Sequence, residues 1–217
     1  MDDERTLKRD LFGEIRLTSV GKDAVVVRDI RCAPWWTRRL ARRLMLREAS
    51  ALAALDGLDG VPALVRQDRD ELARTYLPGA PLHIARTRDA AWFAAAARLL
   101  RRLHRAGVCH NDLAKEPNLL VRDDGSPGII DFQLAWYARQ RSRLFRVAAY
   151  EDIRHLLKHK RYYRADLLTQ RERRILANPS PASRLFRGTV KPVYLFVTRR
   201  ILGWSDREGA GDRTAGD

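Results

Sequence analysis

Residues 110–133 constrain this chain more than any other segment, because they set polar side chains at the ends of two short apolar runs. The runs are Leu119–Val121 and residues 129–130, and a turn rich in Asp, Gly and Pro, residues 123–128, separates them. Short apolar runs around such a turn predict a β-hairpin of buried strands. A hairpin of this kind fixes the side chains that flank it.

Three polar side chains flank the predicted hairpin. Asp112 and Asn118 precede its first strand, and Asp131 follows its second, so all three are expected to reach one small volume. Carboxylate and amide oxygens grouped in this way suit Mg²⁺, which keeps some waters and shares the phosphates of a nucleotide. The alternative is an ordinary hairpin with polar ends. The occurrence of both halves together favours the metal site.

The residues His110-Asn111-Asp112-Leu113 with Asn118, followed by Ile130-Asp131-Phe132-Gln133, resemble the catalytic loop and the metal-binding triplet of protein-kinase-like phosphotransferases. They are most similar to the small bacterial members related to RIO kinases and lipopolysaccharide-core kinases. The resemblance covers about residues 7–160. It implies ATP and Mg²⁺ as cofactors and phosphoryl transfer as the reaction.

The resemblance also implies roles for individual residues. Asp112 would be the base that orients or deprotonates the acceptor hydroxyl, and Asn118 and Asp131 would hold the metal. His110 would support the loop without exchanging protons. The family has four residues between its Asp and Asn, whereas five separate Asp112 from Asn118. Lys115 is our candidate for the loop lysine that touches the transferred phosphate.

The N-terminal part is expected to supply strands and phosphate contacts. Residues 14–20 and 24–30 read as two strands around the turn 21–23. By position Gly13 belongs to the phosphate-covering loop, where kinases carry several glycines. Arg28 stands where the family has a strand lysine, and arginine is not equivalent to a point charge at a tight phosphate site.

A long helix is predicted to open at Pro34 and to run to about Leu55, before Gly57. The expected apolar stripe is Trp36, Leu40, Leu44, Ala51 and Leu55. The arginines expected largely on the other side are Arg38, Arg39, Arg42 and Arg43. Glu48 faces the core side, where an unpaired carboxylate is costly, so Arg28 is its natural partner. The alternative is that Glu48 lies at the edge of the stripe and reaches water.

Two more strands, at 61–65 and 71–77, are expected to close the small sheet, with a stiff linker at 78–81. Residues 74–77, including Tyr76 and Leu77, would then line the nucleotide pocket at the hinge. Asp89 is expected to cap a helix that runs to about Arg105. Its apolar face comprises Trp92, Phe93, Ala96, Leu99, Leu100 and Leu103.

The next predicted helix starts at Val147 or Tyr150. Its Asp152 is expected to support the backbone of the catalytic loop, as an aspartate does in kinases. His155 and His159 have the i, i+4 spacing of a metal pair, but a polar helix face is the favoured interpretation because no third ligand is placed. Residues 189–204 read as an apolar, basic-ended helix that docks either on the C-lobe, which is favoured, or on an anionic membrane.

The net charge of +15 indicates polyanionic neighbours, but only six of the 42 basic residues are lysine, so arginine-rich coding bias explains it equally well. Two cysteines, Cys32 and Cys109, fit a reducing compartment. No signal peptide or apolar run of membrane-spanning length is recognised. We therefore expect a cytoplasmic protein, with peripheral contact with the inner face of the membrane left open, and an undetermined oligomeric state.

Together these patterns predict an α+β, reduced two-lobed protein-kinase-like fold. One domain would span residues 1–205, with an N-lobe at about 1–77, a hinge at about 74–82 and a C-lobe at about 83–205; a disordered tail would follow at 206–217. The predicted function is ATP-dependent phosphotransfer to a protein Ser/Thr or a lipopolysaccharide-type sugar. A pseudokinase that binds nucleotide or acts as a scaffold is the first alternative, and a polyanion-binding protein is the second.

Overall fold

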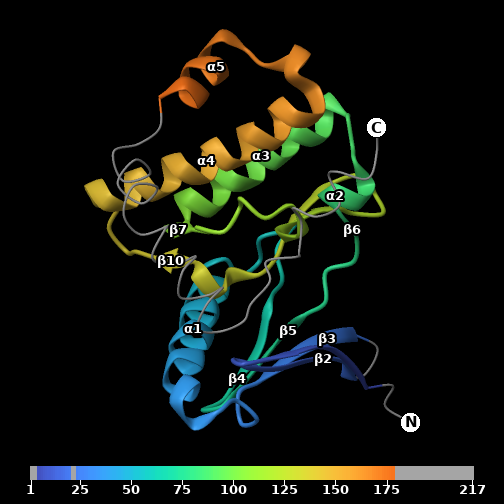
Figure 1. Cartoon of the computed structure of the whole chain (residues 1–217), viewed down its shortest axis with the longest axis vertical. Coiled ribbons are helices and arrows are strands. Elements are labelled where there is room, and N and C mark those ends of the chain that lie inside the picture. The colour runs from blue at the N-terminus through green and yellow to red at the C-terminus, as the bar shows by residue number, and fades with distance from the viewer. Residues whose placement is uncertain (1–3, 21–22, 179–217) are drawn as a thin grey trace, which may run out of the picture.

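The computed structural model describes residues 4–20 and 23–178, which form two lobes (Figure 1). The N-lobe is an antiparallel sheet with one long helix against it, and the C-lobe is mainly helical. The predicted α+β, two-lobed architecture is confirmed. The helix expected at 189–204 and the tail expected at 206–217 lie outside the described residues.

The N-lobe sheet has five strands in the order β1-β2-β3-β5-β4. They are β1 (Arg5–Asp10), β2 (Gly13–Val20), β3 (Asp23–Asp29), β4 (Leu64–Gln67) and β5 (Glu71–Thr75). Four of them overlap the predicted strands, although β4 begins later than expected. β1 corresponds to none of the strands for which we predicted bounds, although the strand-like sequence pattern begins at Leu7; its sequence is charged and largely exposed.

The register of the sheet decides which side chains face the helix. Arg28 lies opposite Leu72 and Val26 lies opposite Arg74 in the antiparallel ladder of β3 and β5. Directly paired residues project to the same face of a sheet, so these four side chains share one face. Leu72 packs in a cluster with helix residues, which shows that this face is the one the helix covers.

That helix, α1 (Trp35–Ala54), has the predicted bounds, but the predicted apolar stripe is wrong at its N-terminal end and is confirmed only at Ala51 and Leu55, which are buried. Trp36 is 53% exposed and Leu40 is 48% exposed. The residues that α1 buries are Thr37, Ala41, Met45, Glu48, Ala49, Ala51 and Leu52. Small alanines on this face let the helix approach the sheet closely, and an indole there would hold the two apart.

Residues 76–79 link β5 to β6 (Ala80–Pro81), the first strand of the C-lobe. β6 pairs with β8 (Leu119–Val121), which pairs with β9 (Pro127–Ile129), so the predicted hairpin is confirmed. A second small sheet pairs β7 (Val108–Cys109) with β10 (Trp136–Tyr137). The two sheets hold both ends of the segment between residues 110 and 131.

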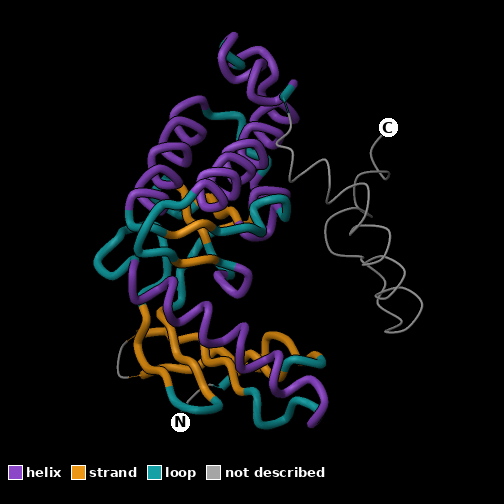
Figure 2. The backbone as a smooth tube through the Cα atoms, turned by 90° about the vertical axis from the view of Figure 1, so that its left-hand side faces the viewer, coloured by secondary structure: helices purple, strands orange, loops and turns teal. Residues whose placement is uncertain are grey.

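Among the described residues, four helices belong to the C-lobe: α2 (Leu82–Ala85), α3 (Ala90–Arg105), α4 (Arg143–Arg164) and α5 (Gln170–Ala177). Three described 3₁₀ turns accompany them: η1 (Glu116–Asn118) precedes β8, η2 (Phe132–Leu134) precedes β10, and η3 (Ala165–Leu167) joins α4 to α5. α3 confirms the predicted helix, including its Asp89 cap and its buried face. α4 begins earlier than predicted, because the Ser142 side chain caps it and Phe145 anchors its first turn in the core. α3 and α4 lie side by side (Figures 1 and 2).

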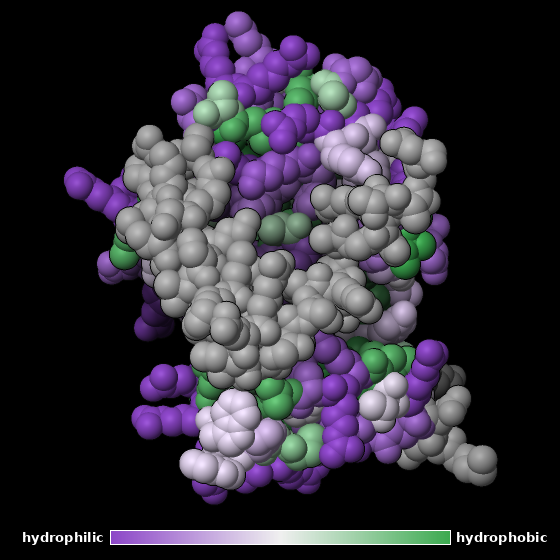
Figure 3. Space-filling view, in the orientation of Figure 1, coloured by the Kyte–Doolittle hydropathy of each residue, from purple (hydrophilic) through white to green (hydrophobic). Residues whose placement is uncertain are grey.

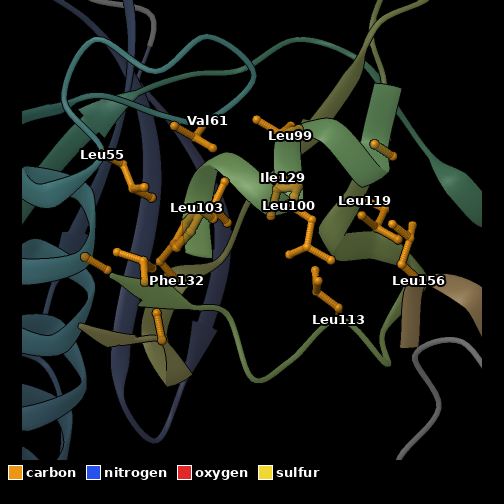
Figure 4. Packing of buried hydrophobic residues seen from close by; sticks show 14 of the residues in the cluster. Leu55, Val61, Leu99, Leu100, Leu103, Leu113, Leu119, Ile129, Phe132 and Leu156 are labelled. Carbon is orange, nitrogen blue, oxygen red and sulfur yellow. The ribbon is translucent and has the colours of Figure 1, made fainter. Parts of the chain in front are cut away.

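The main core joins the two lobes rather than filling one of them. Leu52 and Leu55, at the end of α1, belong to the same buried cluster as Leu103 of α3 and Phe132 of η2 (Figure 4). α1 also packs against η2 and β10. Side chains on α1 are therefore held in position relative to the catalytic-loop segment. Within the described ranges, none of the helices is both long enough and apolar enough to cross a membrane.

Candidate active site

The segment that follows β7 is anchored by Asp152 on α4, as the sequence predicted. The Asp152 carboxylate accepts hydrogen bonds from the backbone N–H groups of His110 (2.8 Å) and Asn111 (2.9 Å). His104 Nε2 lies 3.2 Å from the same carboxylate. Asp152 is 1% exposed, so the hydrogen bonds of its carboxylate are shielded from solvent. It holds Asn111 in a left-handed conformation with φ of 64°.

His110 joins the two halves of the candidate site through both of its ring nitrogens. Nδ1 accepts the backbone N–H of Asp112 at 3.2 Å, and Nε2 donates to the carbonyl oxygen of Ile130 at 2.9 Å. This pattern requires the neutral ring with its proton on Nε2. The ring also makes an edge contact with Phe132. His110 therefore supports the loop, as expected.

Asp112, Asn118 and Asp131 come together as predicted. Asn118 Nδ2 donates to the backbone oxygen of Asp112 at 2.9 Å and to its Oδ2 at 3.2 Å. The turn η1 absorbs the extra residue between Asp112 and Asn118, so the additional length does not separate them. The backbone N–H of Ile130 donates to the Asn118 carbonyl at 3.0 Å, which places Asp131 beside Asn118.

Burial raises the pKa of Asp112, and the nearby charge of Asp131 adds to the effect. Lys115 opposes it, because its Nζ lies 3.0 Å from Asp112 Oδ2. Lys115 is more than half exposed, so its ammonium group also reaches solvent in front of the carboxylate. A carboxylate with a raised pKa is a better proton acceptor when it is ionised.

A buried ion-pair cluster lies opposite, in the N-lobe. Arg28 Nε lies 3.6 Å from Oε2 of Glu48, which confirms the predicted strand-to-helix pair. Arg74 also hydrogen-bonds Glu48, through its Nη1. We predicted Arg74 to line the nucleotide pocket and missed this pairing. Alternate residues of a strand project to the same face, so Arg74 lies on the same side of β5 as buried Leu72. This spacing could have predicted the pairing.

Arg28 is 4% exposed and Glu48 is fully buried. Burial lowers the pKa of Arg28, while the charge of Glu48 raises it. Asp131 and Asp10 also raise the pKa of Arg28, so both carboxylates lie within electrostatic reach of it. The N-lobe cluster and the Asp131 carboxylate at the end of the hairpin are therefore close enough to interact electrostatically.

Several buried polar atoms of these residues have no hydrogen-bond partner among the described residues. They are Nε and Nη2 of Arg28, Oε2 of Glu48 and Oδ1 of Asp131. Burying an unsatisfied polar atom costs about 1–3 kcal/mol. Phosphate oxygens would satisfy the guanidinium, and a divalent cation would satisfy the Asp131 carboxylate. The residues present thus fit a magnesium–nucleotide complex.

The remaining residues predicted to contact the nucleotide each have contacts within the protein. A Cβ atom on Gly13, whose φ is 123°, would lie 2.3 Å from the carbonyl oxygen of Asp29, so close strand packing already requires a glycine there. Tyr76 is 43% exposed and donates its backbone N–H to Ala24. Leu77 packs on Gly128. Nucleotide contact by Gly13, Tyr76 and Leu77 stays a prediction.

Comparisons with known proteins agree with this geometry. Residues 21–139, more than half of the chain, match the model of a phosphotransferase enzyme family. The Rio2 kinase–ADP/Mg²⁺–phosphoaspartate complex from Chaetomium thermophilum is similar in fold, with a TM-score of 0.55 and 18% identity over 77% of this chain and 55% of that chain. A second Rio2 kinase structure from the same organism has a TM-score of 0.58 and 17% identity, over 82% and 59%.

No curated protein matches the sequence. The predicted protein-kinase-like fold with RIO-type resemblance is confirmed. This chain spans between 55% and 59% of the length of the two Rio2 structures, and the low identity supports a likeness of fold.

Proposed function

Because the chain belongs to the phosphotransferase enzyme family, we propose that it transfers the γ-phosphate of ATP, bound with Mg²⁺, to a hydroxyl group of an acceptor. The observation that carries this proposal is the convergence of Asp112, Asn118 and Asp131 opposite the Arg28–Glu48 pair. The Rio2 structure that contains ADP and Mg²⁺ supports the choice of cofactors.

Asp112 is the proposed base. Among the described residues, the side-chain contacts of Asn118 and Lys115 with Asp112 both go to Oδ2. This leaves Oδ1 to accept the proton of the acceptor hydroxyl or to orient that group. Lys115 holds the carboxylate in place and, being half exposed, is positioned to contact the transferred phosphate.

Asn118 and Asp131 are the proposed metal ligands, through the side-chain oxygen of Asn118 and Oδ1 of Asp131. A bound Mg²⁺ would neutralise charge that develops on the phosphate oxygens. Arg28, positioned by Glu48, would direct its unpartnered Nη2 at a phosphate oxygen. Because an arginine remains protonated even when burial lowers its pKa, this contact would persist across the physiological pH range.

The acceptor remains open between a Ser or Thr hydroxyl of a protein and a sugar hydroxyl of a lipopolysaccharide-type molecule. The fold likeness to Rio2 kinase supports a protein hydroxyl as the acceptor. The sequence resemblance to lipopolysaccharide-core kinases supports a sugar hydroxyl. A transfer assay with γ-labelled ATP against both acceptor classes would decide between them.

A pseudokinase is the second candidate, because Arg74 competes with Arg28 for the same carboxylate. In active kinases the corresponding strand residue is a lysine with one carboxylate partner. In a pseudokinase, ATP would bind to the same residues, but its γ-phosphate would not be transferred.

The experiment that tests the proposal measures release or transfer of the labelled γ-phosphate by the purified chain. Asp131→Ala should abolish transfer. Asp123→Ala removes an exposed carboxylate from the hairpin turn and should leave transfer unchanged. Transfer that is absent in all three proteins while ATP still binds would establish the pseudokinase alternative instead.

A further inference from the structure

The surface of α1 that points away from the sheet combines exposed apolar side chains with arginines. Trp35 is 84% exposed, and Trp36 and Leu40 are about half exposed. We call this surface the α1 outer face, and it comprises Trp35, Trp36, Arg39, Leu40, Arg43 and Arg47. It begins at the lower end of the N-lobe in Figure 1, where Figure 3 shows pale and green residues among purple ones.

Helical spacing makes these residues contiguous. Trp35, Arg39 and Arg43 follow one another at intervals of four, as does Arg47 after them, so they form one ridge. Trp36 and Leu40 form the neighbouring ridge at the same interval. An indole pair therefore stands at one end of a row of guanidinium groups.

The arginines of α1 divide into two groups by their contacts. Arg38 donates to the backbone oxygens of Arg31 and Ala33, and Arg42 pairs with Asp70. In the part of the chain that the structure describes, Arg39, Arg43 and Arg47 are exposed or only partly covered and have no such hydrogen bond or ion pair. The first group supports the fold, whereas the second is available to a ligand.

The charge of the α1 outer face is not offset by acidic side chains on the same helix. Glu48 is the acidic residue of α1, and it is buried on the opposite side. At its C-terminal end the face continues into an open hollow of about 260 Å³ between α1 and β10. The hollow is lined by Leu46, Arg47, Ser50, Ala135, Trp136 and Tyr137. None of these lining residues is acidic.

The combination matches an anionic lipid bilayer better than another polyanion. Indole rings partition to the headgroup level of a bilayer, and arginines are attracted to anionic headgroups. Leu40 and Leu46, which is 44% exposed, add aliphatic surface that suits lipid acyl chains better than the charged backbone of a nucleic acid. An amphipathic helix that lies on a membrane needs all three components.

We propose that the α1 outer face docks this protein on the surface of an anionic membrane. Trp35, Trp36 and Leu40 enter the headgroup region, and Arg39, Arg43 and Arg47 contact lipid phosphates. Glu48 projects from the other side of the helix toward Arg28. Docking therefore leaves the candidate active site free of the bilayer, and it requires no transfer activity.

The test is co-sedimentation of the full chain with vesicles of phosphatidylglycerol and phosphatidylcholine, against vesicles of phosphatidylcholine alone. Binding to the anionic vesicles is expected. Replacing Arg39, Arg43 and Arg47 together by Gln should weaken it about 100-fold. The matched control replaces Arg98, Arg101 and Arg102, which are exposed on α3, by Gln and removes the same charge. It should weaken binding less than about 5-fold.

A second measurement does not depend on charge. Vesicles that carry brominated lipids should quench the tryptophan fluorescence of the wild-type chain. They should quench the Trp35→Phe/Trp36→Phe variant distinctly less, because the two exposed indoles of the α1 outer face are absent from it. The substitutions keep an aromatic ring at two exposed positions, so the variant should fold.

Three results would overturn the proposal. The first is equal loss of vesicle binding in the α1 and α3 arginine variants, which would show an effect of net charge alone. The second is unchanged quenching in the double phenylalanine variant. The third is that the protein binds a single-stranded RNA oligonucleotide through Arg39, Arg43 and Arg47 but does not bind vesicles. This result would assign the α1 outer face to nucleic acid.

Discussion

The two halves of the candidate site differ in how completely their polar atoms are paired. In the C-lobe, Asp152 accepts two backbone N–H groups and His110 uses both ring nitrogens. In the N-lobe, two guanidinium groups share the single carboxylate of Glu48. Atoms of both Arg28 and Glu48 lack hydrogen bonds within the described residues.

The difference shows which half is complete before a ligand binds. The catalytic loop is held by hydrogen bonds within the protein, so its geometry does not depend on a nucleotide. The N-lobe cluster carries two positive charges against one negative charge, and burial makes the excess costly. A phosphate group would balance it. The loop is therefore preorganised, whereas the N-lobe cluster would be completed by the nucleotide that the proposed function requires.

The largest effect is expected at Asp112, the proposed base. Asp112→Asn should lower the rate of phosphoryl transfer by about 10²–10⁴-fold, because the base is lost. Burial raises the pKa of Asp112, so its charge costs stability, and the variant should melt at the same temperature or higher. Transfer kinetics and calorimetry on one preparation check both parts. A folded variant that transfers phosphate at the wild-type rate would contradict the proposed role, and a lower melting temperature would contradict the stability prediction.

Removal of Glu48 tests the N-lobe half. Glu48→Ala leaves Arg28 and Arg74 buried without their carboxylate, and the free energy of unfolding should fall by about 3–5 kcal/mol. Urea denaturation measures the change. The double variant Glu48→Ala/Arg74→Met removes one of the stranded charges and should recover part of the loss. If the single variant is as stable as the wild type, the cluster is not buried as described.

Asp152→Ala tests the preorganised half without touching the reacting groups. The loop would lose an acceptor for two backbone N–H groups, at a cost of about 1.5–3 kcal/mol in the free energy of unfolding. We expect the turnover number to fall while the KM for ATP stays near the wild-type value, because Asp152 positions the loop and not the nucleotide. An increase in KM alone would count against preorganisation.

The smallest effect is expected for His155 on α4, which should influence how the free energy of unfolding changes at acidic pH. Burial lowers the pKa of His155 to about 4, so its neutral form is preferred in the folded state. As the pH falls below 6.5 the unfolded chain takes up this proton first, and the free energy of unfolding should decrease between pH 6.5 and about 4. Urea denaturation of His155→Gln across this range should show a shallower decrease. Identical slopes for both proteins would refute the assignment.

Local sequence patterns were sufficient to predict the parts of the structure that are formed by residues close in sequence. The hairpin around residues 123–128, the capped helix α3 and the convergence of Asp112, Asn118 and Asp131 were all expected from spacing and motif. The support from Asp152 came from the family resemblance. In each case a turn, a cap or a short loop restricts the geometry to few possibilities.

The parts that sequence analysis missed depend on contacts between distant segments. Arg74 pairs with Glu48 because the register of β3 with β5 sets it on the face that α1 covers. The predicted stripe of α1 placed Trp36 and Leu40 in the core, whereas the structure buries Thr37, Ala41 and Met45. Hydrophobicity alone does not reveal how closely a helix must approach a sheet.

The sequence by itself thus determined the protein-kinase-like fold class and the identity of the acidic and amide residues that meet beside the hairpin. The tertiary structure decided that two arginines compete for Glu48 and that Trp35 and Trp36 lie on the surface. The physical reason is steric: the small sheet accepts the alanine face of α1 at close range, so the indoles turn outward beside the arginines.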